Sequence, residues 1–232
     1  MPGMRRKVRD LPSEAVTAGR WLVVVALTGV GVGTLELWLA LVDGVPPLSR
    51  PVAVSVVVLI AGMQVVHFLT DLAVNGVEVG FPLGATLVVS VTEAVLWSGW
   101  LAVAGSLGGV RGLFVAGVAF AVALSVQHTV ETNALRKQPL GFRLFDPATV
   151  GFSLVTAAGA TAWLSLNAPV PWTEPFADSV ASLGLDAGAV GVAALGVALL
   201  AERVLVVRMG RSERARSTIR RYRDRVLRSR TR

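Results

Sequence analysis

Two histidines stand in otherwise apolar stretches of this chain, and an acid follows each of them. His67 precedes Asp71 by four residues in MQVVHFLTD, and His128 precedes Glu131 by three in LSVQHTVET. Residues three or four apart lie on one face of a helix, so each segment predicts a helical histidine–carboxylate pair. Histidine changes charge near neutral pH. Pairs of this kind can pass protons, bind a cation or hold a metal ion.

Three further acids, Glu36, Glu93 and Glu202, also lie within apolar runs. A charge at the centre of a bilayer costs about 2.5–3.5 kcal/mol on insertion scales, so such residues normally face the interior of a helix bundle and mark a functional site. We therefore predict that the chain is a small cation- or proton-handling transporter or channel. The predicted relay consists of His67, Asp71, Glu93, His128, Glu131, Glu202 and Glu36.

The rise of a helix predicts how deep these groups lie. His67, His128 and Glu202 fall at one level, about 10 Å from the cytoplasmic boundary, and Glu93 lies about 8 Å deeper. Glu36 falls in the outer third. A purely structural alternative places Asp71 and Glu131 among the headgroups. It also makes Glu202 and its neighbour Arg203 a solvated pair where the last apolar run becomes a basic tail.

Other chemistries fit the same residue types. His67, His128, Glu93 and Glu131 are suitable ligands for a divalent metal, although Glu-x-x-His, the order in di-iron bundles, is reversed at residues 128–131. Two histidines at one depth could also be the axial ligands of haem. A metal- or haem-binding protein of this kind would carry out redox or hydrolytic chemistry. A third alternative is a non-catalytic scaffold or accessory subunit in which buried polar pairs hold helices together.

The motifs of soluble enzymes do not occur. The chain contains no cysteine, which excludes thiolate ligands, cysteine nucleophiles and disulfides. We find no P-loop, His-Glu-x-x-His or Gly-x-Ser-x-Gly motif. These observations argue against an enzyme.

Helices that span a membrane must position these residues. The chain is 53% hydrophobic and 16% charged over 232 residues, and its apolar residues form blocks near the roughly 20 residues that a helix needs to cross a bilayer. We predict an all-α, polytopic membrane protein with six transmembrane helices in one bundle. The spans are Trp21–Val42, Val52–Val74, Phe81–Ala104, Leu113–Ala134, Ala148–Leu166 and Ala187–Val207.

Basic residues predict the orientation. They concentrate in residues 1–20, in the loop after the fourth span, and in residues 208–232, where eleven arginines occur. The positive-inside rule then places both termini in the cytoplasm of a multi-pass plasma membrane protein. The chain therefore divides into a basic segment 1–20, a transmembrane domain 21–207 and an arginine-rich tail 208–232.

The tail is predicted to bind anionic lipid headgroups. Its apolar stripe, Ile219, Tyr222 and Val226, would suit a short amphipathic helix on the membrane. Nucleic acid is disfavoured because no aromatic interleaving or recognised fold accompanies the charge. A homo-oligomer or a larger membrane complex is a further candidate partner. The predicted lipid-binding residues are Arg211, Arg214, Arg216, Arg220 and Arg221.

Two patterns concern the packing of the helices. TLELWL and TEAVLW share residue types, as do MQVVHFLTD and LSVQHTVET, so the bundle could consist of two-helix repeats. Gly29 and Gly33, like Gly108 and Gly112, have a spacing that would let helices approach closely.

Overall fold

The structure is a computed structural model. It describes residues 13–42, 44–45, 49–75, 83–135, 138–167 and 174–230. Within these ranges, the side chains of residues 13–17, 20, 74–75, 135 and 209–230 are not described. The side chains of the predicted lipid-binding arginines, Arg211 to Arg221, therefore lie outside the described part.

Helices make up the whole described fold, as predicted, and no strand occurs in these ranges. Seven are α-helices, and a short 3-10 helix joins two of them. In chain order they are α2 (Ser13–Val42), α3 (Arg50–Asn75), α4 (Leu83–Leu107), α5 (Gly109–Leu135), η1 (Leu140–Phe142), α6 (Pro147–Asn167), α7 (Glu174–Ser182) and α8 (Ala187–Arg230).

Six of these helices are long and apolar enough to cross a membrane, which confirms the predicted multi-pass class. The apolar segments are Trp21–Val42, Arg50–Ala73, Leu83–Leu107, Gly109–Ala134, Pro147–Asn167 and Ala187–Arg208. The fourth begins four residues earlier than predicted because only Gly108 separates α4 from α5. Gly108 and Gly109 have φ of 61° and 62°, a left-handed conformation that glycine adopts without a Cβ clash.

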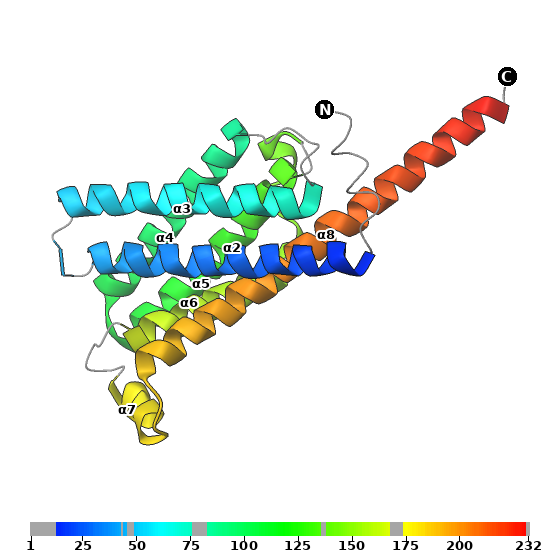
Figure 1. Cartoon of the computed structure of the whole chain (residues 1–232). Coiled ribbons are helices and arrows are strands. Elements are labelled where there is room, and N and C mark those ends of the chain that lie inside the picture. The colour runs from blue at the N-terminus through cyan, green and yellow to red at the C-terminus, as the bar shows by residue number, and fades with distance from the viewer. Residues whose placement is uncertain are drawn as a thin grey trace.

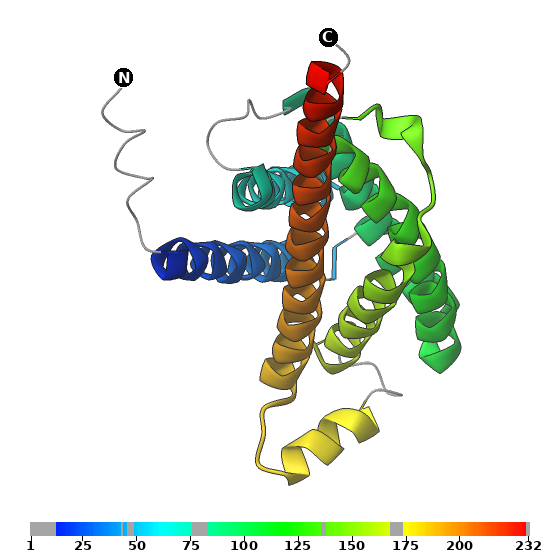
Figure 2. The same ribbon diagram turned by 90° about the vertical axis from the view of Figure 1, so that its right-hand side faces the viewer.

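Neighbouring helices in the chain pack against each other, and α8 closes the bundle. The α2–α3, α3–α4, α4–α5 and α5–α6 pairs are in contact, and α8 packs on α6 and α2. Figures 1 and 2 show α8 crossing the bundle obliquely and continuing beyond it. We call the end where α2 begins and α8 leaves the bundle the tail end, and the opposite end the α7 end (Figure 1).

Several glycines let neighbouring helices approach closely, and one of them, Gly112, was singled out from the sequence: a Cβ there would lie 2.7 Å from the backbone oxygen of Ala104 on α4. A Cβ at Gly159 on α6 would lie 2.3 Å from the Cβ of Ala198 on α8. A Cβ at Gly62 on α3 would lie 2.8 Å from the Cβ of Thr34 on α2. By contrast, a Cβ at Gly29 or Gly33 would meet no atom within 4 Å. That predicted pair therefore does not bring helices together within this chain.

An aromatic cluster fills the bundle toward the α7 end. Trp97 packs edge-on against Trp100, Phe120 and Trp163, with ring centroids 5.6, 4.8 and 6.5 Å away. These side chains are buried together with Trp38 in the main apolar core. The core therefore forms a dry layer on one side of the polar groups described next. The helix packing does not show whether the bundle consists of two-helix repeats, so the repeats stay a prediction.

Candidate functional site

Six ionisable side chains meet inside the bundle, nearer the tail end than the α7 end. They come from four helices, and none is more than 8% exposed. The group, which we call the charged cluster, consists of His67 on α3, Glu93 on α4, His128 and Glu131 on α5, and Glu202 and Arg203 on α8. Five of the six were predicted to form a site, and Arg203 was not.

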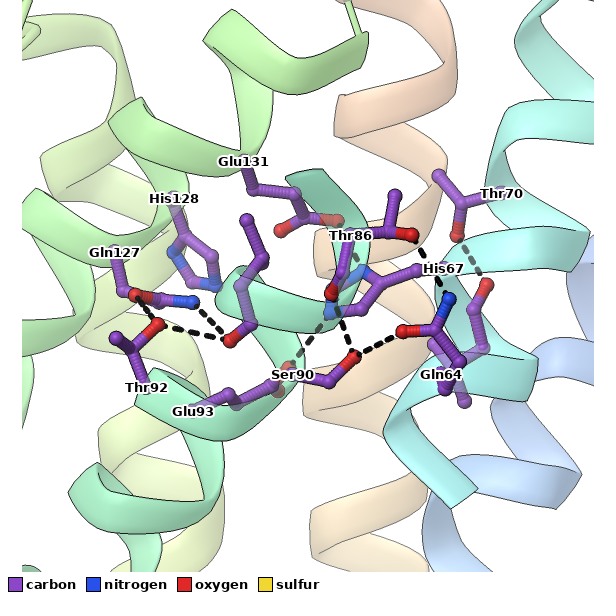
Figure 3. A network of polar contacts seen from close by, with 12 residues as sticks. Gln64, His67, Thr70, Thr86, Ser90, Thr92, Glu93, Gln127, His128 and Glu131 are labelled. Carbon is purple, nitrogen blue, oxygen red and sulfur yellow. Dashed lines mark hydrogen bonds and ion pairs between the residues drawn. The ribbon is translucent and has the colours of Figure 1, made fainter. Parts of the chain in front are cut away.

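His67 lies between two carboxylates that come from neighbouring helices (Figure 3). Its Nε2 is 3.2 Å from Glu93 Oε2, and its Nδ1 is 3.2 Å from Glu131 Oε1. A neutral imidazole has one N–H and one lone pair, and a lone pair facing a carboxylate oxygen is repelled. Both contacts are favourable only if this group holds one extra proton, on the ring or on one of the acids.

The second histidine has one acidic and one hydroxyl neighbour. His128 Nε2 lies 3.5 Å from Glu202 Oε1, and its Nδ1 lies 2.8 Å from Ser153 Oγ. The Ser153 hydroxyl donates to the backbone oxygen of Thr149 at 2.8 Å, so it accepts from His128 Nδ1 in that arrangement. The variable proton of His128 then belongs at Nε2, which faces Glu202.

Arg203 joins the two histidine–acid pairs. Its Nη1 lies 3.5 Å from Glu131 Oε1 and 3.2 Å from Glu202 Oε1. The interpretation of Glu202 and Arg203 as a solvated pair is therefore wrong, since they are 1% and 4% exposed. The reason is geometric: α8 passes beside α5 and α6, so both side chains enter the bundle. Thr156 on α6 completes the site by donating to Glu202 Oε2 at 2.6 Å.

Glutamine and hydroxyl side chains hold α4, which carries Glu93, in place on both sides. From α3, Gln64 donates to Thr86 at 2.8 Å and accepts from Ser90 at 3.0 Å. From α5, Gln127 accepts from Thr92 at 2.9 Å and donates to the backbone oxygen of Val89 at 2.8 Å. Figure 3 shows these bonds flanking Glu93. They fix the register in which Glu93 reaches His67, although the sequence predicted Glu93 to lie about 8 Å deeper.

Glu36, a predicted member of the relay, lies away from the charged cluster. Glu36 on α2 accepts a hydrogen bond from the indole N–H of Trp163 on α6, toward the α7 end. On α4, Trp97 lies nearer the α7 end than Glu93 does. On α5, Phe120 lies nearer the α7 end than His128 does, and both aromatic residues belong to the aromatic cluster. Glu36 is therefore not part of the charged cluster. Asp71 is buried on α3, one helical turn from His67.

The geometry offers little support for a metal or haem centre. Within the described residues, no group of three or more histidine, cysteine, aspartate or glutamate side chains is arranged to hold a metal ion. Protein groups contact both ring nitrogens of His67 and of His128. Neither ring turns an uncontacted nitrogen toward a haem iron.

Charge balance defines what the cluster can do. Three glutamates, ionised, carry three negative charges, and Arg203 is permanently positive. The cluster is therefore neutral when both histidines are protonated and has a net charge of −2 when neither is. Buried charges in lipid are stable only when they are paired. The cluster thus favours holding up to two protons, or a cation that replaces them.

Fold and site together define the class of protein: a six-span membrane bundle with a buried histidine–glutamate–arginine cluster. Comparisons of the chain with protein-family models, with curated proteins and with solved structures give no match. Its function is therefore argued from the cluster itself.

Proposed function

We propose that this protein moves protons, or a cation in exchange for protons, through its helix bundle by means of the charged cluster. The observation that carries this proposal is His67, whose two nitrogens face Glu93 and Glu131 at 3.2 Å each. That arrangement favours an extra proton inside the membrane-spanning region, because each imidazole nitrogen lies close to a carboxylate oxygen. A group that holds a proton between two acids on different helices is a suitable relay.

Arg203 divides the cluster into two proton-binding halves. Arginine does not give up its proton in proteins, so protons do not pass through it. One half is Glu93, His67 and Glu131, and the other is Glu202 and His128. Because Arg203 contacts an acid in each half, loss of a proton from one half changes the field in the other.

The proposal places the protein in the plasma membrane with both termini in the cytoplasm. The positive-inside rule supports this orientation because basic residues concentrate in the sequence before the first span, after the fourth and after the sixth. The charged cluster then lies on the cytoplasmic side of the aromatic cluster. Protons would reach it first from the cytoplasm, and movement past the aromatic layer would complete transport.

Flux in liposomes tests the proposal. Purified protein is reconstituted with a pH-sensitive dye inside, a pH gradient is applied, and potassium with valinomycin clamps the membrane potential. We expect the wild type to dissipate the gradient and His67→Gln to abolish this activity. Glu174→Gln, at an exposed acid on α7, is the matched control and should behave like the wild type. Equal flux in His67→Gln and the wild type, or none in either, would contradict the proposal.

A scaffold is the second candidate, because one observation favours it. The hydrogen bonds of Gln64 and Gln127 tie α3, α4 and α5 together without any titratable group. Polar contacts of this kind contribute roughly 0.6–2 kcal/mol each within membranes. Folded variants of His67, Glu93 and His128 with wild-type behaviour would support this role.

A further inference from the structure

One cation lies between two carboxylates at the centre of the charged cluster. Glu131 Oε1 and Glu202 Oε1 both face Arg203 Nη1, at 3.5 and 3.2 Å. The same two oxygens also face the histidines, at 3.2 Å for His67 Nδ1 and 3.5 Å for His128 Nε2. Arg203 and the histidine protons therefore compete for the same two oxygens.

The Nη1 atom of Arg203 faces these carboxylates without forming a hydrogen bond to any residue that the structure describes. Glu131 Oε1, Glu202 Oε1 and Arg203 Nη1 are all buried. None of the three atoms forms a hydrogen bond within the described part of the chain. Arginine usually binds a carboxylate through two parallel N–H groups, which adds geometric fit to the charge. Here a single nitrogen serves two acids as a point charge. Buried polar atoms without a hydrogen bond are uncommon, and binding of an ion is one explanation for them.

We propose that Glu131 and Glu202 form a binding site for a monovalent inorganic cation such as Na⁺. The guanidinium of Arg203 fills this site when no ion is bound and moves out when the ion binds. This inference rests on the proposed function and names the cation that the protons are exchanged for. The oxygens at the site suit a hard cation, which prefers carboxylate and hydroxyl ligands. Thr156 Oγ1 donates to the other oxygen of this carboxylate, Glu202 Oε2, at 2.6 Å and so holds the carboxylate in place.

The Arg203 side chain can reach the membrane interface when it leaves the site. Arg203 lies five residues from Arg208, the exposed residue at the tail end of the sixth span. Five residues correspond to about 7.5 Å along a helix. A long arginine side chain can cover this distance and keep its guanidinium at the membrane interface while its stem stays in the apolar region.

Equilibrium binding of ²²Na⁺ to purified protein in detergent, without a pH gradient, tests the site. If Arg203 leaves the site in roughly one wild-type molecule in ten, Arg203→Ala should bind Na⁺ about tenfold more tightly. The matched control is the triple variant Arg203→Ala/Glu131→Gln/Glu202→Gln, in which saturable binding should disappear. Guanidinium should compete with Na⁺ in Arg203→Ala, and choline should not.

The inference is overturned if Arg203→Ala binds Na⁺ no better than the triple variant. Should that variant not fold, Arg203→Met, which keeps the buried stem, is measured in the same way. The wild type is measured beside it for a saturable rise in unfolding temperature with Na⁺ but not choline. Absence of Na⁺ binding in all folded forms would overturn the inference. Proton flux in liposomes would be unaffected by that result, so the two proposals fail separately.

Discussion

At the level of single residues, the cluster is costly to bury and therefore depends on complete pairing. Removing one partner from a buried ion pair leaves an uncompensated charge, which destabilises more than the pair itself stabilises. Glu202 has the most partners: Arg203 and His128 contact its Oε1, and Thr156 donates to its Oε2. Glu36 accepts one hydrogen bond, from the indole of Trp163, and is only partly buried.

We expect Glu202→Gln to lower the free energy of unfolding by about 3 kcal/mol, because it leaves Arg203 and His128 facing an amide. Glu36→Gln should cost about 1 kcal/mol, the value of one hydrogen bond. Both are measured by chemical unfolding of the purified protein in micelles. Equal losses in the two variants would show that Glu202 is not the more strongly coupled acid.

At the level of the helices, α6 and α8 approach closely at Gly159, where a methyl group would meet Ala198 and the backbone oxygen of Ala194. This contact sets the position of α8, and with it the positions of Glu202 and Arg203. Thr156, which donates to Glu202, lies one turn away from Gly159 on the same helix. The close approach thus brings the hydroxyl within reach of the acid.

Gly159→Ala should destabilise the bundle by about 1–3 kcal/mol, because the added methyl group overpacks the α6–α8 contact. Ala198→Gly in the same chain should restore most of the loss, since the 2.3 Å clash would no longer occur. Gly151→Ala is the control on the same helix, where a Cβ meets nothing within 4 Å. Thermal unfolding in micelles measures all four proteins. Failure of Ala198→Gly to restore stability would mean that another contact governs the spacing.

At the level of the whole molecule, α8 joins the membrane domain to the basic tail. It runs without a break from Ala187 to Arg230, so the tail continues the sixth span as one helix. The tail, residues 208–232, contains eleven arginines and two acids, so its net charge of +9 exceeds the +7 of the whole chain. The contact of the predicted lipid-binding arginines with anionic headgroups stays a prediction, because their side chains lie outside the described part. Movement of this helix would reach Glu202 and Arg203 directly.

The predicted orientation is testable because the chain has no cysteine. Single cysteines are introduced at Ser179 on α7 and at Phe142 on η1, both exposed and at opposite ends of the bundle. A membrane-impermeant maleimide should label Ser179→Cys in intact cells, and Phe142→Cys only after permeabilisation. The cysteine-free wild type is the blank. The reverse pattern would place the termini outside.

The sequence by itself determined the six spans and most of the cluster. Apolar runs of this length form membrane-spanning helices, because lipid offers no hydrogen-bond partner to the backbone N–H and C=O groups. Ionisable residues within such runs must face the interior. These two constraints are local, so they are readable from His67, Glu93, His128, Glu131 and Glu202 without knowing which helices touch.

Only the tertiary structure decided which of these groups meet. From the sequence, Arg203 could form a solvated pair with Glu202. It instead becomes a buried partner of Glu131 because α8 packs obliquely across α6 and α5. Glu36 looks like a relay member, and is separated because its helix presents it to Trp163. Gly159, rather than Gly29 or Gly33, makes a close contact. Each outcome depends on the rotation and crossing of whole helices, which side chains distant in sequence set together.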